Sequence, residues 1–334
     1  MKKNLLVTLA DRNYIEQAKQ LFSSVYWNAG WKGDYMLLAH EIPEKDLKWF
    51  RDKGILIKKC KLLIEKAWGG EKESEKFSPI IADKFYLFTQ EFKKWKNIVY
   101  LDADIIVRAN LDELTKVKKF GAVNDFHLGK LKKQFVNSKD IPAKIKRKYN
   151  LNKISFNAGV FAFNTSIIKD NTFSDINFLL QKNLNFFYYG EQTALNLYFY
   201  NKWKKIPLAY NLCVDGFNYY HAPQKGIILH FAGSNKPWRS GNPCYNEWKK
   251  NLEKAELIDL NDIPSGQKFY EIKIYHKFSF FLRLNLFYYN LKLFLIHLKN
   301  KYNEFIGKIG ILIKKKNPDM YYFLRKILFY KLSP

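Results

Sequence analysis

Cysteine is scarce in this chain of 334 residues, and the three that occur are widely spaced: Cys60, Cys213 and Cys244. An odd and scattered set predicts neither a disulfide framework nor a zinc knuckle, and it favours a reducing cytoplasm. Long uncharged apolar runs are missing too, because Arg283 and Lys292 interrupt the most apolar region. No stretch therefore reaches the ~18 uncharged residues that a membrane span needs.

The N-terminus lacks the pattern of a secretory signal peptide, and the chain has few acidic residues for its length. The basic start, MKKNLLVTLA, leads into an apolar stretch that ends early at Asp11 and Arg12, so we expect a first strand there and no signal peptide. Asp and Glu number 31 against 57 Lys and Arg, which gives a net charge of +26. Such a balance favours an anionic partner, whether nucleic acid, anionic lipid or a phosphorylated substrate.

Apolar residues are plentiful. They make up 47% of the chain, which excludes wholesale disorder. Apolar runs predict strands at 5–9, 35–39 and 55–57, with helices at 15–27 and 44–53 between them. This alternation is typical of a parallel sheet with right-handed crossovers, whose ligands bind at the carboxyl ends of the strands.

The sequence NIVYLDADIIV, residues 97–107, predicts a buried strand that Asp102 and Asp104 interrupt. Only Ala103 separates them, and residues two apart on a strand face the same side. Two like charges are costly to bury together, and a divalent metal at the end of the strand would offset that cost. The alternative is a turn after Leu101 with both carboxylates in water, but the flanking apolar residues favour the metal.

The sequence on both sides of the central strand predicts further helices and strands, several of which carry charged residues. The expected elements are a helix at 78–92 with Lys84, strands at 121–125, 156–164 and 227–231, and a helix whose first turn holds Glu191. The glycine-rich segment 68–76 predicts a loop. Residues 130–150 are strongly basic and form either a solvated helix or a flap over an anionic ligand. A helix dipole favours a carboxylate such as Glu191 in the first turn, so a structural and a catalytic role carry equal weight.

A metal site needs more ligands than two carboxylates. His230 would add a nitrogen at the end of the last strand, although a lone histidine there is more often a core residue. Mn²⁺ accepts such mixed ligands, whereas Mg²⁺ prefers oxygen. Lys236, close after Gly233, could reach substrate phosphates as a point charge. A metal with a lysine suits a diphosphate leaving group, because both stabilise its growing negative charge.

The composition shifts near residue 271. From there to the C-terminus the chain has 13 Lys and Arg against 3 acidic residues, mixed with large aromatic and aliphatic side chains. This composition is typical of helices that lie on anionic bilayers. The alternative is a helical subdomain that packs on the core and leaves its lysines solvated.

Several motifs occur in order: Ala10-Asp11 with Asn13-Tyr14, then YLDADIIV, FNAGVFAFN, EQTALN and LHFAGSNKPW. An Asp-x-Asp pair alone is weakly diagnostic, but the ordered set is specific. Over roughly residues 4–240 the chain resembles family 8 of the retaining glycosyltransferases. That family includes bacterial lipopolysaccharide galactosyl- and glucosyltransferases and the glycogenins.

The resemblance implies an α/β fold of the GT-A type, with a Rossmann-like nucleotide half. With the shift in composition, it predicts a catalytic domain at 1–265 and a basic, aromatic, mainly helical segment at 266–334. It implies a UDP-sugar donor, Mn²⁺ or Mg²⁺, and a glycan or lipid-linked acceptor such as a lipopolysaccharide core. We expect a cytoplasmic enzyme bound peripherally to the inner face of the membrane, with no specific nucleic-acid partner.

Motif positions imply roles for individual residues. The metal ligands would be Asp102, Asp104 and His230. The other contacts to the nucleotide and diphosphate would be Ala10, Asp11, Asn13, Tyr14, Lys84, Ala103, Gly233 and Lys236, with Tyr14 stacked on the base. The contacts to the donor sugar would be Asp125, Asn157 and Gln192, and the candidate catalytic residues are Gln192, Glu191 and Asp125.

Two positions depart from the family pattern. Many relatives have Asp-Gln-Asp where this chain has Glu191-Gln192-Thr193, which leaves the donor sugar open. An arginine common before the central strand corresponds to Lys84, which cannot bind phosphate in a bidentate manner. Retention could arise by double displacement or by front-face attack. Double displacement needs a carboxylate nucleophile, and the residue at the matching position, Gln192, carries a poorly nucleophilic amide. We therefore favour front-face attack.

Two other classes of protein share parts of this pattern. Haloacid-dehalogenase-type phosphatases also end a buried strand in Asp-x-Asp, with the first aspartate as the nucleophile. In those enzymes the motif usually closes the first strand, whereas here about a hundred residues precede it. A nucleic-acid-binding protein would fit the charge and the aromatic content, but no recognition motif of the known modules is present.

Overall fold

The computed structural model describes residues 2–69, 76–125, 129–214 and 226–261. The chain divides into two units, Met1–Ser279 and Phe280–Pro334, and the described residues all belong to the first. The C-terminal segment expected at 266–334, and most of the loop expected at 68–76, lie outside the described residues.

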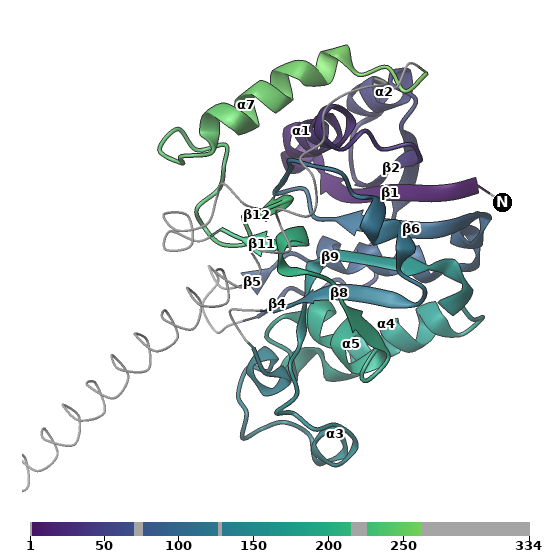
Figure 1. Cartoon of the computed structure of the whole chain (residues 1–334). Coiled ribbons are helices and arrows are strands. Elements are labelled where there is room, and N and C mark those ends of the chain that lie inside the picture. Colours follow the sequence, from purple (N-terminus) through teal and green to yellow (C-terminus); the bar gives the residue numbers. More distant parts are fainter. Residues whose placement is uncertain (1, 70–75, 126–128, 215–225, 262–334) are drawn as a thin grey trace, which may run out of the picture. The chain divides into compact units, whose positions relative to one another are not determined.

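The main sheet has seven strands in the order β10-β8-β9-β6-β1-β2-β3 (Figure 1). Their bounds are β1 Lys2–Asp11, β2 Asp34–His40, β3 Leu56–Cys60, β6 Trp95–Leu101, β8 Phe120–Asn124, β9 Phe156–Asn164 and β10 Trp203–Lys205. Neighbouring strands are parallel except at β9, which runs antiparallel to β6 and β8. The expected strand–helix alternation is confirmed, and β9 is an antiparallel strand within this mainly parallel sheet.

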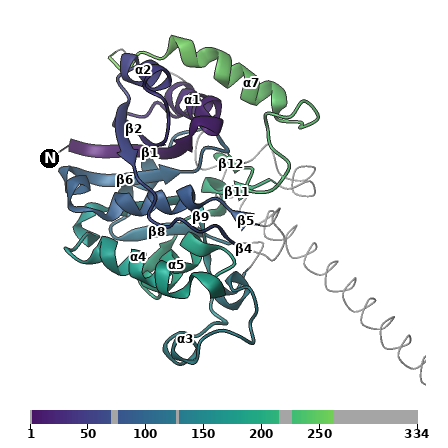
Figure 2. The same ribbon diagram turned by 180° about the vertical axis from the view of Figure 1, so that it is seen from behind.

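Helices cover both faces of this sheet (Figures 1 and 2). The α-helices are α1 Ile15–Ser24, α2 Glu44–Asp52, α3 Ala143–Lys148, α4 Thr172–Asn183, α5 Gly190–Tyr198 and α7 Tyr245–Glu253. One face packs Leu5 and Val7 of β1 in a continuous core with side chains of α4 and α5. The other face carries α1, which contacts β1 and α7. Alternate residues of β1 are therefore buried in different layers, as its unbroken apolar pattern requires.

The strand expected at 97–107 is in fact two strands in different sheets. β6 ends at Leu101, the chain bends through Asp102, Ala103 and Asp104, and β7 (Ile105–Val107) begins after them. β7 joins a second sheet of order β11-β12-β7, in which β11 is Leu212–Cys213 and β12 is Ile228–His230. The expectation that both carboxylates stand on one strand is therefore wrong, because a bend holds them where the chain changes sheet.

The second sheet brings a distant histidine to this bend. In the antiparallel pair β7–β12, His230 lies opposite Ile105, and the N–H of Phe231 donates to the carbonyl oxygen of Asp104 at 3.0 Å. β1 and β6 are neighbouring parallel strands. After β1 the chain continues to β2 and β3 on one side of the main sheet, and after β6 it continues to strands on the other side. The carboxyl ends of such a pair flank the usual ligand crevice of an open α/β sheet.

Two expected helices have a different form. Residues 78–92 form two 3₁₀ helices, η4 (Pro79–Phe88) and η5 (Gln90–Lys94), and no α-helix. In η4 the adjacent residues Asp83 and Lys84 are both buried and reach different partners. In the basic region 130–150, only α3 is α-helical. In both views α3 lies apart from the strands of the main sheet (Figures 1 and 2).

Candidate active site

Asp102, Asp104 and His230 form one cluster. Each offers a ligand atom, and these atoms lie within 4.8 Å of one another. Nε2 of His230 is 3.8 Å from Oδ2 of Asp102 and 3.3 Å from Oδ1 of Asp104. The structure thus brings together the three side chains that the sequence singled out for a metal.

Gly159 leaves the space that such a cluster needs. A Cβ atom on this residue of β9 would lie 2.2 Å from Cε1 of His230 and 2.7 Å from Oδ2 of Asp102. The carbonyl oxygen of Gly159 accepts the N–H of Asp102 at 2.8 Å, so the close approach is built into the backbone. Two carboxylates and an imidazole that converge across a glycine fit a divalent cation with mixed oxygen and nitrogen ligands.

Asn211 and Asn157 orient the histidine. Nδ1 of His230 lies 2.8 Å from Oδ1 of Asn211, and Nδ2 of Asn211 donates to Oδ1 of Asn157 at 2.8 Å. With the amide placed in this way, Nδ1 carries a proton and Nε2 faces the carboxylates, as in many metal sites. Asn211 is not among the site residues predicted from the sequence. Its signal was an amide in the otherwise apolar stretch 208–214, directly before β11.

Lys236 neutralises part of the negative charge. Its Nζ donates to Oδ2 of Asp104 at 2.6 Å and to the carbonyl oxygen of Phe231 at 2.7 Å. Burial alone would raise the pKa of Asp104, but His230 and Lys236 lower it below its ordinary value. Burial would lower the pKa of His230, but Asp104 raises it to about 10. A metal ion that binds Nε2 has to displace that proton.

A second buried cation stands behind Asp102. Nζ of Lys84 lies 3.2 Å from Oδ1 of Asp102 and 3.4 Å from Oε1 of Glu191. Burial would lower the pKa of Lys84, but these two carboxylates raise it above its ordinary value, so the ammonium stays charged. The hydroxyl of Tyr100 donates to the same Asp102 oxygen at 2.7 Å. Asp102 is therefore fixed from behind, with Oδ2 left on the side of His230.

The position of Lys84 depends on its neighbour Asp83. Oδ2 of Asp83 lies 2.7 Å from Nδ1 of His40, at the carboxyl end of β2, and both side chains are buried. Burial raises the pKa of Asp83 to about 6, although His40 acts in the opposite direction. The pair fastens η4 to β2 and so holds Lys84 at the level of Asp102.

Gln192 links α5 to the acidic end of β8. Its Oε1 accepts the N–H of Ala158 at 2.9 Å, and its Nε2 donates to Oδ2 of Asp125 at 3.0 Å. Gln192 and Asp125 are both buried. Both polar atoms of this amide are therefore engaged within the protein. Glu191 lies in the first turn of α5, as expected, and is paired with Lys84.

The residues expected at the nucleotide lie at the end of β1 and directly after it. Asp11 caps a short 3₁₀ turn by accepting the N–H of Asn13 at 2.9 Å. The half-buried Tyr14 meets Trp238 edge to face, with their ring centroids 5.9 Å apart. Burial raises the pKa of Tyr14, Lys236 lowers it, and Asp104 raises it, so this ring lies within electrostatic reach of the cluster. A Cβ on Gly233 would meet no described atom within 4 Å.

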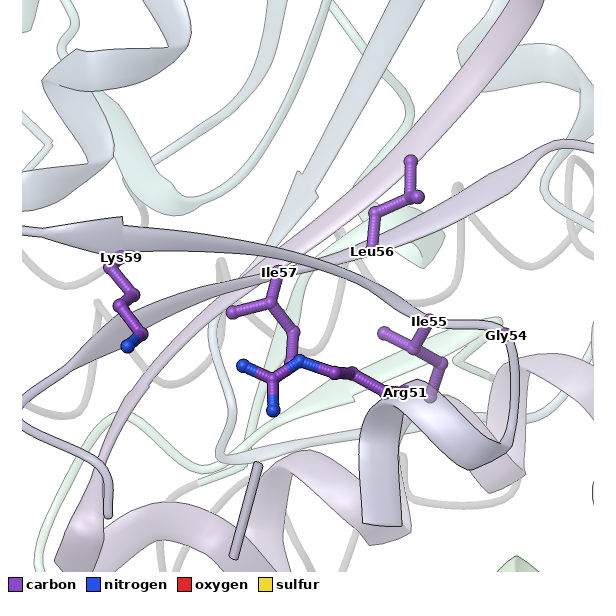
Figure 3. A pocket seen from close by; sticks show the side chains of 6 residues that line it. All are labelled: Arg51, Gly54, Ile55, Leu56, Ile57 and Lys59. Carbon is purple, nitrogen blue, oxygen red and sulfur yellow. The ribbon is translucent and has the colours of Figure 1, made fainter. Parts of the chain in front are cut away.

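A separate groove of about 450 Å³ runs along the edge strand β3 (Figure 3). It is lined by Arg51, Gly54, Ile55, Leu56, Ile57 and Lys59. None of these residues belongs to the cluster of Asp102, Asp104 and His230, and the lining has no carboxylate. The groove therefore offers no site for the metal chemistry described above.

The chain is similar to a known protein family and to several characterised sequences. The model of the family described as glycosyl transferase family 8 matches residues 5–241. Glycosyltransferase GlyF of Streptococcus pneumoniae is 26% identical over 259 residues, which cover 72% of this chain and 58% of GlyF. Galactinol synthase 4 of Arabidopsis thaliana is 25% identical over 239 residues, 66% of this chain and 67% of the synthase. The chain thus spans little more than half the length of GlyF.

Solved structures share the fold. An active-site mutant of LgtC matches with a TM-score of 0.60 at 17% identity, over 78% of this chain and 98% of LgtC. The bifunctional glycosyltransferase WbbM matches with a TM-score of 0.58 at 19% identity, over 78% of this chain and 52% of WbbM. At these identities the likeness concerns the fold alone. The expected GT-A fold is confirmed.

Proposed function

The chain belongs to glycosyl transferase family 8, and from this premise we propose that it transfers a hexose from a UDP-sugar to a hydroxyl group of a glycan or glycolipid, with retention of configuration. The observation that carries the proposal is the convergence of Asp102, Asp104 and His230 across Gly159. A phosphatase of the haloacid-dehalogenase type needs no such histidine.

We propose that these three residues hold Mn²⁺, with Mg²⁺ as the alternative. When bound, the ion would supply charge neutralisation to the diphosphate leaving group. Lys236 reaches the same place, because its Nζ already lies 2.6 Å from Asp104. On release from Asp104 it can bind a phosphate oxygen as a point charge. Asp11, Asn13 and Tyr14 would bind the uridine, with Tyr14 packed against the base.

For the chemical step we propose front-face attack. The acceptor oxygen bonds to the anomeric carbon on the side from which the diphosphate departs. The bond from that carbon to the diphosphate oxygen breaks, and this oxygen takes the proton of the hydroxyl. Double displacement would need a carboxylate nucleophile on the opposite face. Gln192 has none, its Oε1 is occupied by Ala158, and Glu191 is paired with Lys84.

Replacing Gln192 with alanine should slow transfer about tenfold to a hundredfold without abolishing it. The loss releases the tether between α5 and Asp125, which misplaces contacts to the donor sugar. The measurement is the initial rate with saturating donor, with Gln90→Ala, an exposed amide, as the matched control. Complete loss together with a sugar–protein adduct in the mass spectrum would overturn the front-face route.

Hydrolysis of a panel of UDP-hexoses tests the function without knowledge of the acceptor. We expect slow release of UDP from one preferred donor, dependent on Mn²⁺ and abolished by a chelator. Simple phosphate esters should remain intact. Hydrolysis of phosphate esters without binding of any UDP-sugar would instead support the phosphatase.

We also propose that the acceptor is lipid-linked and that the segment 266–334 holds the enzyme on the inner face of a membrane. Its support is the charge and aromatic content of the sequence. Among the described residues, no helix has both the length and the hydropathy to cross a bilayer.

Reversing the charge of Lys314, Lys315 and Lys316 should weaken binding to anionic vesicles at least roughly tenfold, because each basic residue near such a surface contributes about 1 kcal/mol. Co-sedimentation of the full chain measures this affinity. Replacing the same lysines with arginine is the control and should leave binding intact. Equal binding of the charge-reversed and wild-type proteins would refute the membrane role of this segment.

A further inference from the structure

A strongly basic lobe, residues 129–154, stands beside the candidate active site. It holds nine Lys and Arg and a single acidic residue, Asp140. All nine cations are exposed: Lys130, Lys132, Lys133, Lys139, Lys144, Lys146, Arg147, Lys148 and Lys153. In the described part of the chain, none of them forms an ion pair with a carboxylate; Asp140 accepts a hydrogen bond from Asn137.

The fold of the basic lobe does not require this charge. Its inner side is apolar and belongs to the main core: Leu131, Phe135, Ile141, Ile145 and Tyr149 are buried there. The cations that do make contacts use neutral partners. Lys146 donates to the carbonyl oxygen of Lys139, and Lys153 donates to Oδ1 of Asn201. The concentration of like charge therefore has a destabilising effect within the lobe, and an external anion would relieve it.

Large apolar side chains are exposed among these cations. Val136 is 42% exposed, Ile154 is 56% exposed and the adjoining Phe186 is 36% exposed. Val136 and Phe186 are neighbours, because the N–H of Val136 donates to the carbonyl oxygen of Phe186 at 3.0 Å. Lysines interspersed with exposed aliphatic and aromatic side chains are typical of surfaces that lie on anionic bilayers.

The basic lobe is attached to the residues expected to contact the donor sugar. The carbonyl oxygen of Gln134 accepts the N–H of Tyr188 at 2.9 Å and the hydroxyl of Thr193 at 3.2 Å. Thr193 lies in α5 directly after Gln192. On the other side, Gly129 donates its N–H to the carbonyl oxygen of Asp125 at 2.9 Å. Whatever binds the lobe is therefore held close to the site of transfer.

We propose that the basic lobe binds the headgroups of an anionic lipid bilayer and holds the active site at the membrane surface. The proposal is independent of the segment 266–334, since it rests on described residues alone. Single-stranded nucleic acid would need a platform of exposed aromatic rings on which bases stack. Of the three large apolar residues exposed on this surface, Val136 and Ile154 are aliphatic and Phe186 is a single aromatic ring, which is no stacking platform and favours a bilayer.

The test compares two charge-reversed forms of the full chain. The lobe variant is K132E/K133E/K144E/R147E. The control is K93E/K96E/K118E/K119E, which makes the same change in net charge at exposed residues near the amino ends of β6 and β8. Binding to phosphatidylcholine vesicles is measured with and without phosphatidylglycerol. We expect the lobe variant to bind the anionic vesicles at least roughly tenfold more weakly and the control to change about twofold or less.

Both variants should bind UDP in the presence of Mn²⁺ as the wild type does, which shows that each is folded. Equal loss of vesicle binding in the two variants would overturn the proposal, because net charge alone would then explain the effect. Unchanged vesicle binding of the lobe variant would also overturn it. If the lobe variant lost only the binding of a short single-stranded RNA and kept its vesicle binding, the partner would be a nucleic acid and the proposal would be wrong.

Discussion

Replacing Asp104 with asparagine should lower the transfer rate about a hundredfold to a thousandfold and abolish binding of Mn²⁺ at micromolar concentrations. The amide keeps the shape of the side chain but removes its charge. Asp104 lies 3.3 Å from Nε2 of His230 and 2.6 Å from Nζ of Lys236, so the change leaves two cationic groups without their shared carboxylate. A metal ion would then meet a net positive site.

The matched control is Asp170→Asn, which makes the same change at an exposed position. Initial rates over a range of Mn²⁺ concentrations, with calorimetric titration of the metal, separate weaker metal binding from slower chemistry. If Asp104→Asn kept both the rate and the Mn²⁺ dependence of the wild type, Asp104 would not be a metal ligand.

Gly159→Ala should be nearly as damaging, although it removes no functional group. The new methyl group would lie 2.2 Å from Cε1 of His230 and 2.7 Å from Oδ2 of Asp102, distances that Cβ atoms do not tolerate. One of the two side chains must move, and a displacement of about 1 Å can cost about a hundredfold in rate. We expect this loss in kcat/KM, together with weaker binding of Mn²⁺.

Gly241→Ala is the control for this substitution, because a Cβ there would meet no described atom within 4 Å. Thermal unfolding of both variants shows whether Gly159→Ala is folded. A folded Gly159→Ala protein with wild-type activity and metal affinity would contradict the arrangement of Asp102 and His230 described above.

The pattern of apolar residues along short stretches of the sequence predicted much of the fold. The strand expected at 156–164 is β9, in which the apolar run from Val160 to Phe163 favours a buried strand. The first strands and helices were also expected at nearly their observed places, and Glu191 lies in the first turn of α5. These elements depend on residues close together in the chain, which periodicity reports directly.

The error at the central strand concerns relations between distant residues. The apolar run from Ile98 to Val107 has the pattern of one strand, and only the pairing of β7 with β12 shows why it breaks at Asp102. That pairing also places His230 beside Asp104. The meeting of these residues was inferred from metal chemistry and from family resemblance, because no local signal encodes it.

Supporting contacts were the least predictable part of the site. Asn211 orients His230 across a hydrogen bond between separate segments, and Lys84 lies between Asp102 and Glu191, which come from different elements. A sequence pattern shows that a polar residue lies in an apolar stretch, but the partner that it meets is set by tertiary packing. Lys84 was expected to contact phosphate, and the structure pairs it with two carboxylates.

Under the proposed function, Asp102, Asp104 and His230 together would bind the metal ion that neutralises the diphosphate of the donor. Electron spin-echo envelope modulation of Mn²⁺, bound to the full chain with UDP, reports the atoms around the ion. We predict nitrogen modulation from a coordinated imidazole, absent in His230→Ala, together with phosphorus coupling from UDP. Phosphorus coupling with the same nitrogen signal in wild type and His230→Ala would show that His230 is not a ligand of the ion.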